Sequence, residues 1–189
     1  MLLKIEREVC LAKYRNFPLC PYDPNSDEEV FYYPKTVSGG WYDLYAKTKR
    51  EFSKILQMEF TKLVKECGFE NLIFFGDKPT PWITKLSSKR TDNAFIIKAV
   101  RYFEDNKLGK KFNGGVQVGI SELPEFIKHF YCLTRSDGTF GGFYFSDPAQ
   151  NILGFIHYSG EVLFQTLIEE FESKFVKSIK KTAFKRNNR

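Results

Sequence analysis

Apolar positions are densest between residues 139 and 175 of the chain. Aromatic and β-branched residues fill positions 141–145 and 152–158, and the intervening segment carries aspartate, proline and asparagine, which favour a turn. This pattern predicts a β-hairpin in which Phe145 faces Ile152 and Phe140 faces His157. Residues 162–165 are too few for periodicity to decide, and they fit either a third strand or the first turn of a helix.

The end of the chain carries a helical pattern. Apolar residues recur every three or four positions at Phe164, Ile168, Phe171, Phe175 and Ile179. We therefore expect a C-terminal amphipathic helix that covers the hairpin. Beyond the last of these positions the chain is polar, so we expect it to bury little and to behave as a tail.

A longer helical pattern runs from about residue 43 to about residue 67. An apolar residue recurs every three or four positions, and the lysines lie mostly off that side. Asp43 is the expected N-cap. Gly68 is the expected left-handed residue after the helix, with Phe69 packing back on Val64.

Shorter patterns alternate between strand and helix along the rest of the chain, and residues 1–15 suit either. The patterns predict strands at 29–33, 71–75 and 82–86, a hairpin of 111–112 with 116–118 around Asn113-Gly114, and helices from 91 or 92 to 106 and from Ser121 to 133. A regular strand–helix–strand rhythm is missing. The sequence therefore predicts a single α+β domain over residues 1–179, largely an antiparallel sheet with helices packed on one side, and a basic tail at 180–189.

Length and composition place the chain among single-domain globular proteins. Its 189 residues suit one domain, and no apolar run approaches the roughly 20 residues of a membrane helix. Charged residues near the start do not match the apolar segment of a signal peptide. The cysteines include no C-x-x-C pair and lie at Cys10, Cys20, Cys67 and Cys132. These features predict a cytoplasmic protein with free thiols and no membrane partner.

Positive charge is concentrated at the end of the chain. The formal net charge is +6, and residues 174–189 hold seven basic residues and no acid, so the rest of the chain is close to neutral. Such a tail can bind nucleic acid or another polyanion, or it can be the solvated end of a helix. The residues expected to bind a polyanion are Lys177, Lys180, Lys181, Lys185 and Arg186.

Motifs for several reactions and cofactors are missing from the sequence. It contains no phosphate-binding P-loop, no G-x-G-x-x-G, no H-E-x-x-H and no G-x-S-x-G. The loop at 23–29 begins like a calcium loop, but Glu28 and Pro34 occupy positions that need glycine and glutamate. His157, and the pair His129 and Cys132, fit structural roles better than catalytic ones. We therefore expect no metal and no cofactor.

Aromatic residues gather before and within the predicted long helix. Tyrosine and tryptophan are frequent where proteins meet partners, although they also line the rim of a core. The residues expected to bind a partner are Tyr32, Tyr33, Trp41, Tyr42, Tyr45 and Trp82. The leading hypothesis is a small protein–protein interaction module that performs no chemistry. The alternatives are nucleic-acid binding through the tail, and an enzyme built from scattered residues such as His157, Asp147, Glu161 and Arg135.

Overall fold

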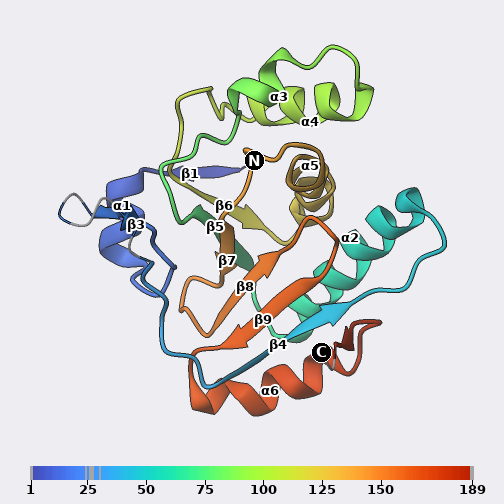
Figure 1. Cartoon of the computed structure of the whole chain (residues 1–189). Helices are drawn as coiled ribbons and strands as arrows, with labels where there is room; N and C mark the ends of the chain where they lie inside the picture. The colour runs from blue at the N-terminus through green and yellow to red at the C-terminus, as the bar shows by residue number, and fades with distance from the viewer. Residues whose placement is uncertain (1, 24, 26–27, 30, 188–189) are drawn as a thin grey trace.

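An antiparallel sheet forms the centre of the computed structural model (Figure 1), which describes residues 2–23, 25, 28–29 and 31–187. The strands are β1 (Leu3–Ile5), β2 (Tyr22–Asp23), β3 (Glu28–Glu29), β4 (Ser38–Asp43), β5 (Asn71–Gly76), β6 (Gly115–Gly119), β7 (Phe143–Ser146), β8 (Ile152–Ile156), β9 (Val162–Thr166) and β10 (Lys185–Arg186). The helices are α1 (Arg7–Lys13), α2 (Lys49–Glu66), α3 (Lys85–Lys89), α4 (Ala94–Asp105), α5 (Leu123–Ser136) and α6 (Glu169–Ile179). The predicted α+β class with a largely antiparallel sheet is confirmed.

Eight strands pair in the order β1-β6-β5-β7-β8-β9-β4-β10, and every pair is antiparallel. The pair β2–β3 forms a separate two-stranded hairpin. The two edges of the large sheet therefore come from the start and the end of the described chain, β1 and β10. The short β10 pairs with only part of β4, at Tyr42 and Asp43.

The larger core lies between the sheet and four of the helices, with α2 and α5 covering one face (Figure 1). Phe60 of α2 meets Phe145 of β7 edge to face at 4.9 Å, and Phe126 of α5 meets Phe74 of β5 at 4.6 Å. Burying a side chain of this size stabilises the fold by about 1.5–3 kcal/mol. Because β-strand side chains alternate between faces, the residues next to Phe145 in β7 and next to Phe74 in β5 point to the other side of the sheet.

The opposite face is covered only in part, by α1 and the loop after it (Figure 1). Phe17 packs against Phe75 of β5 at 5.6 Å. Arg7 fixes α1 to the sheet, since its guanidinium lies 4.7 Å from the centre of the Phe75 ring and donates to the carbonyls of Gly76 and Lys78, each at 3.1 Å. The sequence predicted helices on one side of the sheet only, and α1 lies on the other side.

The long helix begins later than the sequence predicted. Residues 38–43 form β4, which pairs with β9, and Thr48 rather than Asp43 is the N-cap of α2. The Thr48 hydroxyl accepts from the Glu51 amide at 3.2 Å. The end was predicted correctly, because Gly68 takes a φ of 74° and the Phe69 amide bonds the Val64 carbonyl at 3.1 Å.

One predicted strand and one predicted strand pairing are wrong. Residues 82–86 form no strand; Trp82 is buried, and Thr84 caps the short helix α3. Residues 111–112 do not pair with 116–118, because β6 lies between β1 and β5 and takes its hydrogen bonds from them. The strand predicted at 71–75 and the helices predicted to end near 106 and 133 are present as β5, α4 and α5. The predicted strand at 29–33 falls partly outside the described residues.

The hairpin β7–β8 exists with a different register. Phe145 lies opposite Gly154 and Tyr144 opposite Phe155, so the predicted pairing of Phe145 with Ile152 is wrong by two residues. The predicted pairing of Phe140 with His157 is wrong as well, since β7 begins only at residue 143. Residues 162–166 are a strand, and α6 begins at Glu169, which leaves Phe164 in the sheet.

The chain beyond Ile179 is packed against the fold. Thr182 and Phe184 are buried, and the Phe184 ring lies 5.3 Å from that of Phe164. Lys185 and Arg186 form β10 opposite Asp43 and Tyr42 of β4. The expectation that this segment buries little is therefore wrong, while the boundary at residue 179 stays a prediction.

Two properties of the described residues bear on the expected cell compartment. None of their helices is both long enough and apolar enough to cross a membrane. The four cysteines are free, as predicted, and burial raises the pKa of the Cys10 and Cys67 thiols to about 11 in each case. The cytoplasmic location stays a prediction.

Candidate functional site

A line of aromatic side chains crosses the sheet face that α1 leaves uncovered. Neighbouring ring centres lie 6.3 Å apart for Tyr33 and Tyr144, 5.1 Å for Tyr144 and Phe155, and 6.3 Å for Phe155 and Trp41. His157 lies 6.0 Å from Trp41. We call this set the aromatic row; its members are Phe31, Tyr33, Trp41, Tyr144, Phe155, His157 and Tyr158.

Strand alternation explains how the row forms. Tyr144 and Phe155 are direct partners in the β7–β8 ladder, so their side chains stand on the same face. Their neighbours Phe145 and Ile156 point into the helix-covered core. Trp41 stands on the row's face in the same way, between core-facing positions of β4. Trp41 is 37% exposed and Tyr158 is 63% exposed, so a partner can reach the row.

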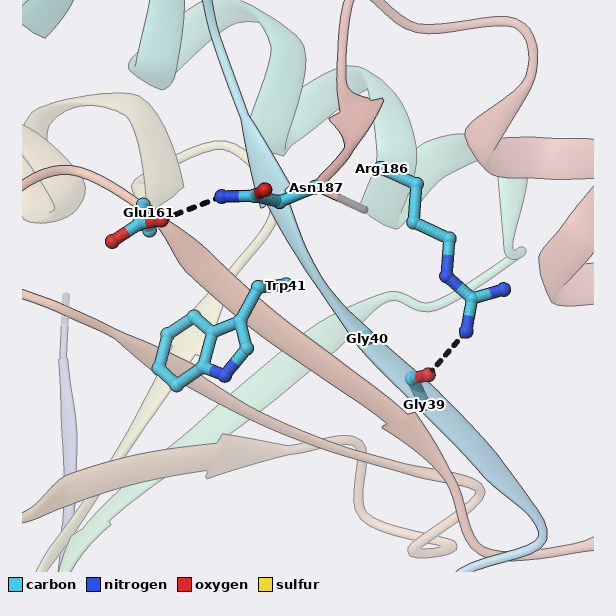
Figure 2. Close-up of a pocket in the computed structure, with 6 residues that line it drawn as sticks. All are labelled: Gly39, Gly40, Trp41, Glu161, Arg186 and Asn187. Atoms are coloured by element: carbon cyan, nitrogen blue, oxygen red, sulfur yellow. Dashed lines mark hydrogen bonds between the residues drawn. The ribbon is translucent and has the colours of Figure 1, made fainter. Parts of the chain in front are cut away.

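A hollow of about 410 Å³ lies beside the row where β10 ends (Figure 2). It is lined by Gly39, Gly40, Trp41, Glu161, Arg186 and Asn187. Arg186 donates from Nη2 to the Gly39 carbonyl at 2.8 Å, and Asn187 donates from Nδ2 to Glu161 Oε1 at 2.9 Å. Figure 2 shows Arg186 and the Trp41 ring on either side of β4, with the two glycines between them. We call this the edge hollow.

The two glycines leave room for the side chains of Arg186 and Gln165 to lie against β4. A Cβ atom at Gly40 would lie 2.8 Å from Arg186 Nε, and one at Gly39 would lie 2.6 Å from Gln165 Cγ. Larger residues at these positions would push both side chains away. Arg186 is the direct cross-strand partner of Tyr42, so its side chain stands on the Tyr42 face of β4. Burial raises the pKa of Tyr42, and the positive charge of Arg186 acts in the opposite direction.

A polar turn lies at the same end of the row as the edge hollow. His157 Nδ1 lies 2.7 Å from Ser159 Oγ, and the same hydroxyl donates to Glu161 Oε2 at 3.0 Å. Because the Ser159 proton points to the carboxylate, the imidazole does not activate this hydroxyl as a nucleophile. The three side chains therefore stabilise the β8–β9 turn, and Glu161 presents a carboxylate to the edge hollow.

The structure separates the six residues that were expected to bind a partner. Tyr33 and Trp41 belong to the row, and Tyr32 is exposed nearby, where its backbone pairs with Leu19. Tyr42 points to the other face and packs on Phe164 at 5.7 Å. Tyr45 is 82% exposed but has no ring contact to the row.

The sixth residue, Trp82, is a correction. It is fully buried among core phenylalanines, with its Nε1 donating to the Gly114 carbonyl at 2.9 Å. It therefore cannot belong to a surface that contacts a partner. Sequence reasoning also missed Tyr144 and Phe155 as row residues. Both were correctly predicted to lie in strands, but their place in the row depends on the order of the strands in the sheet.

The five basic residues expected to bind a polyanion do not form one free patch. Lys181 pairs with Glu66 of α2 at 2.6 Å. Lys177 and Lys180 are exposed at the end of α6, while Lys185 and Arg186 lie in β10 on opposite faces. Their role with polyanions stays a prediction.

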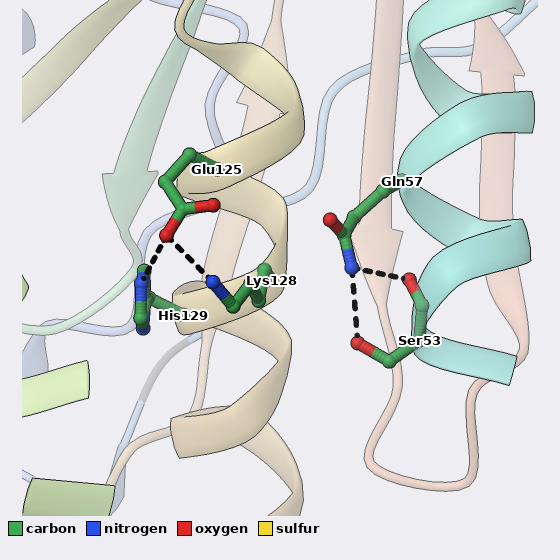
Figure 3. Close-up of polar contacts among 5 residues, drawn as sticks. All are labelled: Ser53, Gln57, Glu125, Lys128 and His129. Atoms are coloured by element: carbon green, nitrogen blue, oxygen red, sulfur yellow. Dashed lines mark hydrogen bonds and ion pairs between the residues drawn. The ribbon is translucent and has the colours of Figure 1, made fainter. Parts of the chain in front are cut away.

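The other histidine, His129 of α5 (Figure 3), is buried against Tyr102 of α4. His129 Nε2 lies 2.8 Å from Glu125 Oε1, which also accepts from Lys128 at 2.7 Å, and the imidazole stacks on Tyr102 at 4.4 Å. Burial lowers the pKa of His129, against the opposing effect of Glu125. Figure 3 also shows Gln57 of α2, which donates to the Ser53 carbonyl at 2.7 Å. The hydrogen bonds of the first set lie within α5, and those of the second set lie within α2.

Cys132, three residues after His129, does not have the properties of a reactive thiol. Burial raises the pKa of Cys132, with a hydrogen bond to Ser136 acting in the opposite direction. A thiol with a raised pKa is a poor nucleophile at neutral pH. The arrangement supports the structural role that the sequence favoured.

The scattered residues of the enzyme alternative do not meet in one place. Asp147 is buried and accepts from the amides of Ala149, Asn151 and Ile152 in the β7–β8 loop. Arg135 donates to the Tyr131 hydroxyl on α5 at 3.1 Å. Only His157 and Glu161 come close, at 4.0 Å. Within the described part of the chain, no three histidine, cysteine or acidic side chains form a cluster that could hold a metal ion.

Comparisons with protein-family models, curated proteins and solved structures give no match for this chain. The aromatic row and the edge hollow beside it are therefore the features on which a function can be argued.

Proposed function

We propose that the chain is a protein-binding module whose partner contacts the aromatic row. The observation that carries the proposal is a line of aromatic rings on the sheet face opposite α2 and α5, in which Phe31, Tyr33, Trp41 and Tyr158 are each at least 36% exposed. Tyrosine and tryptophan are enriched in protein interfaces because they bury a large area with little loss of side-chain freedom. Contiguous apolar patches on a protein surface often mark interaction sites.

The charges around the row favour a protein over a nucleic acid. Glu161 lies in the edge hollow with Trp41, and Asp43 stands on the same face of β4, two residues away. Bases can stack on aromatic rings, but such surfaces pair the rings with a positively charged groove for the phosphates. Two carboxylates, Glu161 and Asp43, lie beside Trp41 against one lysine, Lys185, the cross-strand partner of Asp43. The charges of these residues therefore do not make a positive groove for phosphates.

Quantitative co-purification from an extract of the cells that express the protein tests the proposal. The full chain is compared with a Trp41→Ala/Tyr33→Ala variant and with a control, Tyr45→Ala/Phe95→Ala, which also removes two exposed aromatic rings but lies outside the row. We expect a partner whose capture falls by about 30-fold in the first variant, as loss of interface hot spots implies, and is unchanged in the control.

Thermal unfolding of each variant shows that the fold is intact. A partner captured equally by both variants would contradict the proposal. So would an absence of any protein partner, or capture that depends on Lys180, Lys181 and Lys185 and disappears after nuclease treatment. The last outcome would support the nucleic-acid alternative instead.

A further inference from the structure

The outward side of α2 carries a row of positive charges. Beyond its first turn, the exposed residues of the helix are Lys54, Met58, Lys62 and Lys65. At 3.6 residues per turn these four side chains fall within an arc of about 80° around the helix axis. Arg50 is exposed one turn before Lys54. We call these five residues the cationic ridge, which is about 22 Å long from Arg50 to Lys65 at 1.5 Å per residue.

The helix α6 extends the ridge at its C-terminal end. Gly68 follows α2, and a Cβ atom there would lie 3.0 Å from Lys174 Nζ. The ammonium group of Lys174 therefore lies beside the end of α2, close to Lys65. Lys177, three residues further along α6, is exposed as well. The positive surface thus comes from two helices that are far apart in the sequence.

The acids of α2 are bonded elsewhere and do not neutralise the ridge. Glu51 accepts from the Lys47 amide at 2.8 Å at the start of the helix. Glu59 and Glu66 are partly buried, and they accept from Ala183 and Lys181 of the C-terminal segment.

The ridge cations also lack partners within the described part of the chain. There, Arg50, Lys54, Lys62 and Lys65 form no ion pair. Their charge is therefore available to a ligand.

Helix stability does not explain this arrangement. Like charges three or four residues apart destabilise a helix, and Arg50 with Lys54 and Lys62 with Lys65 have these spacings. Arg50 also lies in the first turn, where the helix dipole disfavours a cation. A solvated helix face commonly alternates acids with bases. A row of unpaired cations suits an extended anion instead.

The side chains of α2 favour a DNA duplex over other polyanions. Single-stranded nucleic acid is held by stacking of its bases on aromatic rings, and α2 exposes no aromatic side chain. A helix that lies in a membrane needs a free apolar face, whereas Leu56 and Phe60 of α2 are buried in the core. The major groove of B-DNA is wide enough to receive a convex helix between its phosphates, while that of duplex RNA is narrow.

We propose that the cationic ridge binds the phosphate backbone of duplex DNA without reading its sequence. Each lysine that contacts a phosphate releases counterions from the DNA, which drives binding. Phosphate contacts position a protein on a duplex but carry no direct sequence information. This function is additional to the proposed protein binding, because α2 covers the sheet face opposite the aromatic row.

Fluorescence anisotropy tests the inference at several salt concentrations. The probe is a labelled DNA duplex of about 20 base pairs, which at 3.4 Å per base pair is longer than the ridge. The full chain is compared with the ridge variant Lys54→Gln/Lys62→Gln/Lys65→Gln. The control, Lys89→Gln/Lys98→Gln/Lys110→Gln, removes the same charge from exposed lysines outside the ridge.

We expect the ridge variant to bind the duplex at least about 10-fold more weakly than the full chain at low salt, because three phosphate contacts are lost. The slope of log affinity against log salt should flatten by up to about 2.7, at about 0.9 for each lost contact. The control should flatten it by less than one contact. Thermal unfolding should show no loss of stability in the ridge variant, since the removed lysines repel one another.

Two results with DNA would overturn the inference. One is an absence of binding by the full chain at low salt, and the other is equal weakening in both variants, which would reflect net charge alone. Vesicles that contain phosphatidylserine and polyglutamate serve as further probes. If the ridge substitutions weaken binding to either of these more than binding to DNA, the ridge belongs to a membrane or to an acidic protein, and the inference fails.

Capture of the protein partner separates this inference from the proposed function. The ridge variant should capture the partner as well as the full chain does, because the aromatic row lies on the other face of the sheet. Loss of that capture in the ridge variant would overturn the inference, since the ridge would then belong to the partner's contact surface. If the partner does not depend on Trp41 and Tyr33 but DNA binding depends on the ridge, the proposed function fails and this inference stands.

Discussion

Asp137 connects two helices through one buried carboxylate. It is 2% exposed at the end of α5, and it accepts from the hydroxyls of Thr84 and Ser87 at the start of α3. Its other oxygen accepts from the amide of Thr139 at 2.9 Å and from the hydroxyl at 2.6 Å. Burial alone would raise the pKa of Asp137, but the hydrogen bonds from Ser87, Thr139 and Thr84 outweigh it and lower that pKa.

A pH-dependent loss of stability follows at this residue. Asp137→Asn should lower the free energy of unfolding by about 2 kcal/mol at pH 7, because hydrogen bonds to a charged acceptor are lost. The folded-state pKa lies below the ordinary value of about 3.9, so the carboxylate stabilises the fold above that pH and loses this effect as the pH falls through the folded value. Urea unfolding at several pH values from 7 to 3 should show the difference between variant and wild type shrinking below about pH 4.

Asp92 provides the control for this experiment. It is exposed and pairs with Arg90 at 2.7 Å on the surface. Asp92→Asn should leave stability unchanged at pH 7 within error, as expected for a surface ion pair. If both substitutions have the same small effect, Asp137 does not hold α3 to α5.

The segment after Ile179 was predicted to bury little, and in the structure it is packed against the fold. The Ala183 amide donates to Glu59 of α2 at 2.8 Å, and Ser178 donates to the Glu66 carbonyl at 3.0 Å. Phe184 lies under the sheet edge against Phe164. These contacts hold β10 beside β4, so the edge hollow depends on a docked segment.

Phe184→Ala should lower the free energy of unfolding by about 3 kcal/mol, as expected for truncation of a buried aromatic side chain. Phe95→Ala is the matched control, because Phe95 is 75% exposed and its loss should cost less than about 0.5 kcal/mol. Urea unfolding measures both. Equal small losses would mean that the segment after Ile179 is not docked.

Residue pattern predicted strand and helix positions better than it predicted strand pairing. The β7–β8 register was wrong by two residues, and a two-residue shift keeps every side chain on its own face. For that reason Phe145 was correctly placed in the core although its partner was wrong. The start of α2 was misread because Tyr42 and Leu44 continue a helical spacing, while the pairing of β4 with β9 depends on residues at least 120 positions away.

The site was harder to predict than the fold. Tyr33 and Trp41 were identified from residue type, but Tyr144 and Phe155 join them only through the order of strands in the sheet. Trp82 was misassigned because it was chosen by residue type alone, whereas long-range contacts with phenylalanines bury it. Residue type indicates a capacity for binding, and tertiary structure decides whether the side chain is accessible.

At the scale of the whole molecule, the two faces of the sheet differ in how they are covered. One face is buried under α2 and α5, and the other is covered by α1 only over β5 and neighbouring strands. The rest of this face, from Tyr144 of β7 at the border of the α1 cluster to Trp41 of β4, carries the aromatic row and ends at the edge hollow. The central claim of the proposed function is that this uncovered area is the binding surface.

Amide hydrogen exchange on the complex with the captured partner tests that claim most directly. Compared with the free protein, exchange should slow in residues 31–33, 38–43 and 155–161, which hold most of the row and the edge hollow, because binding excludes water and adds hydrogen bonds there. Exchange in α2 and α6 should be unchanged. Protection confined to these helices, or to the basic segment 177–183, would contradict the proposed binding surface.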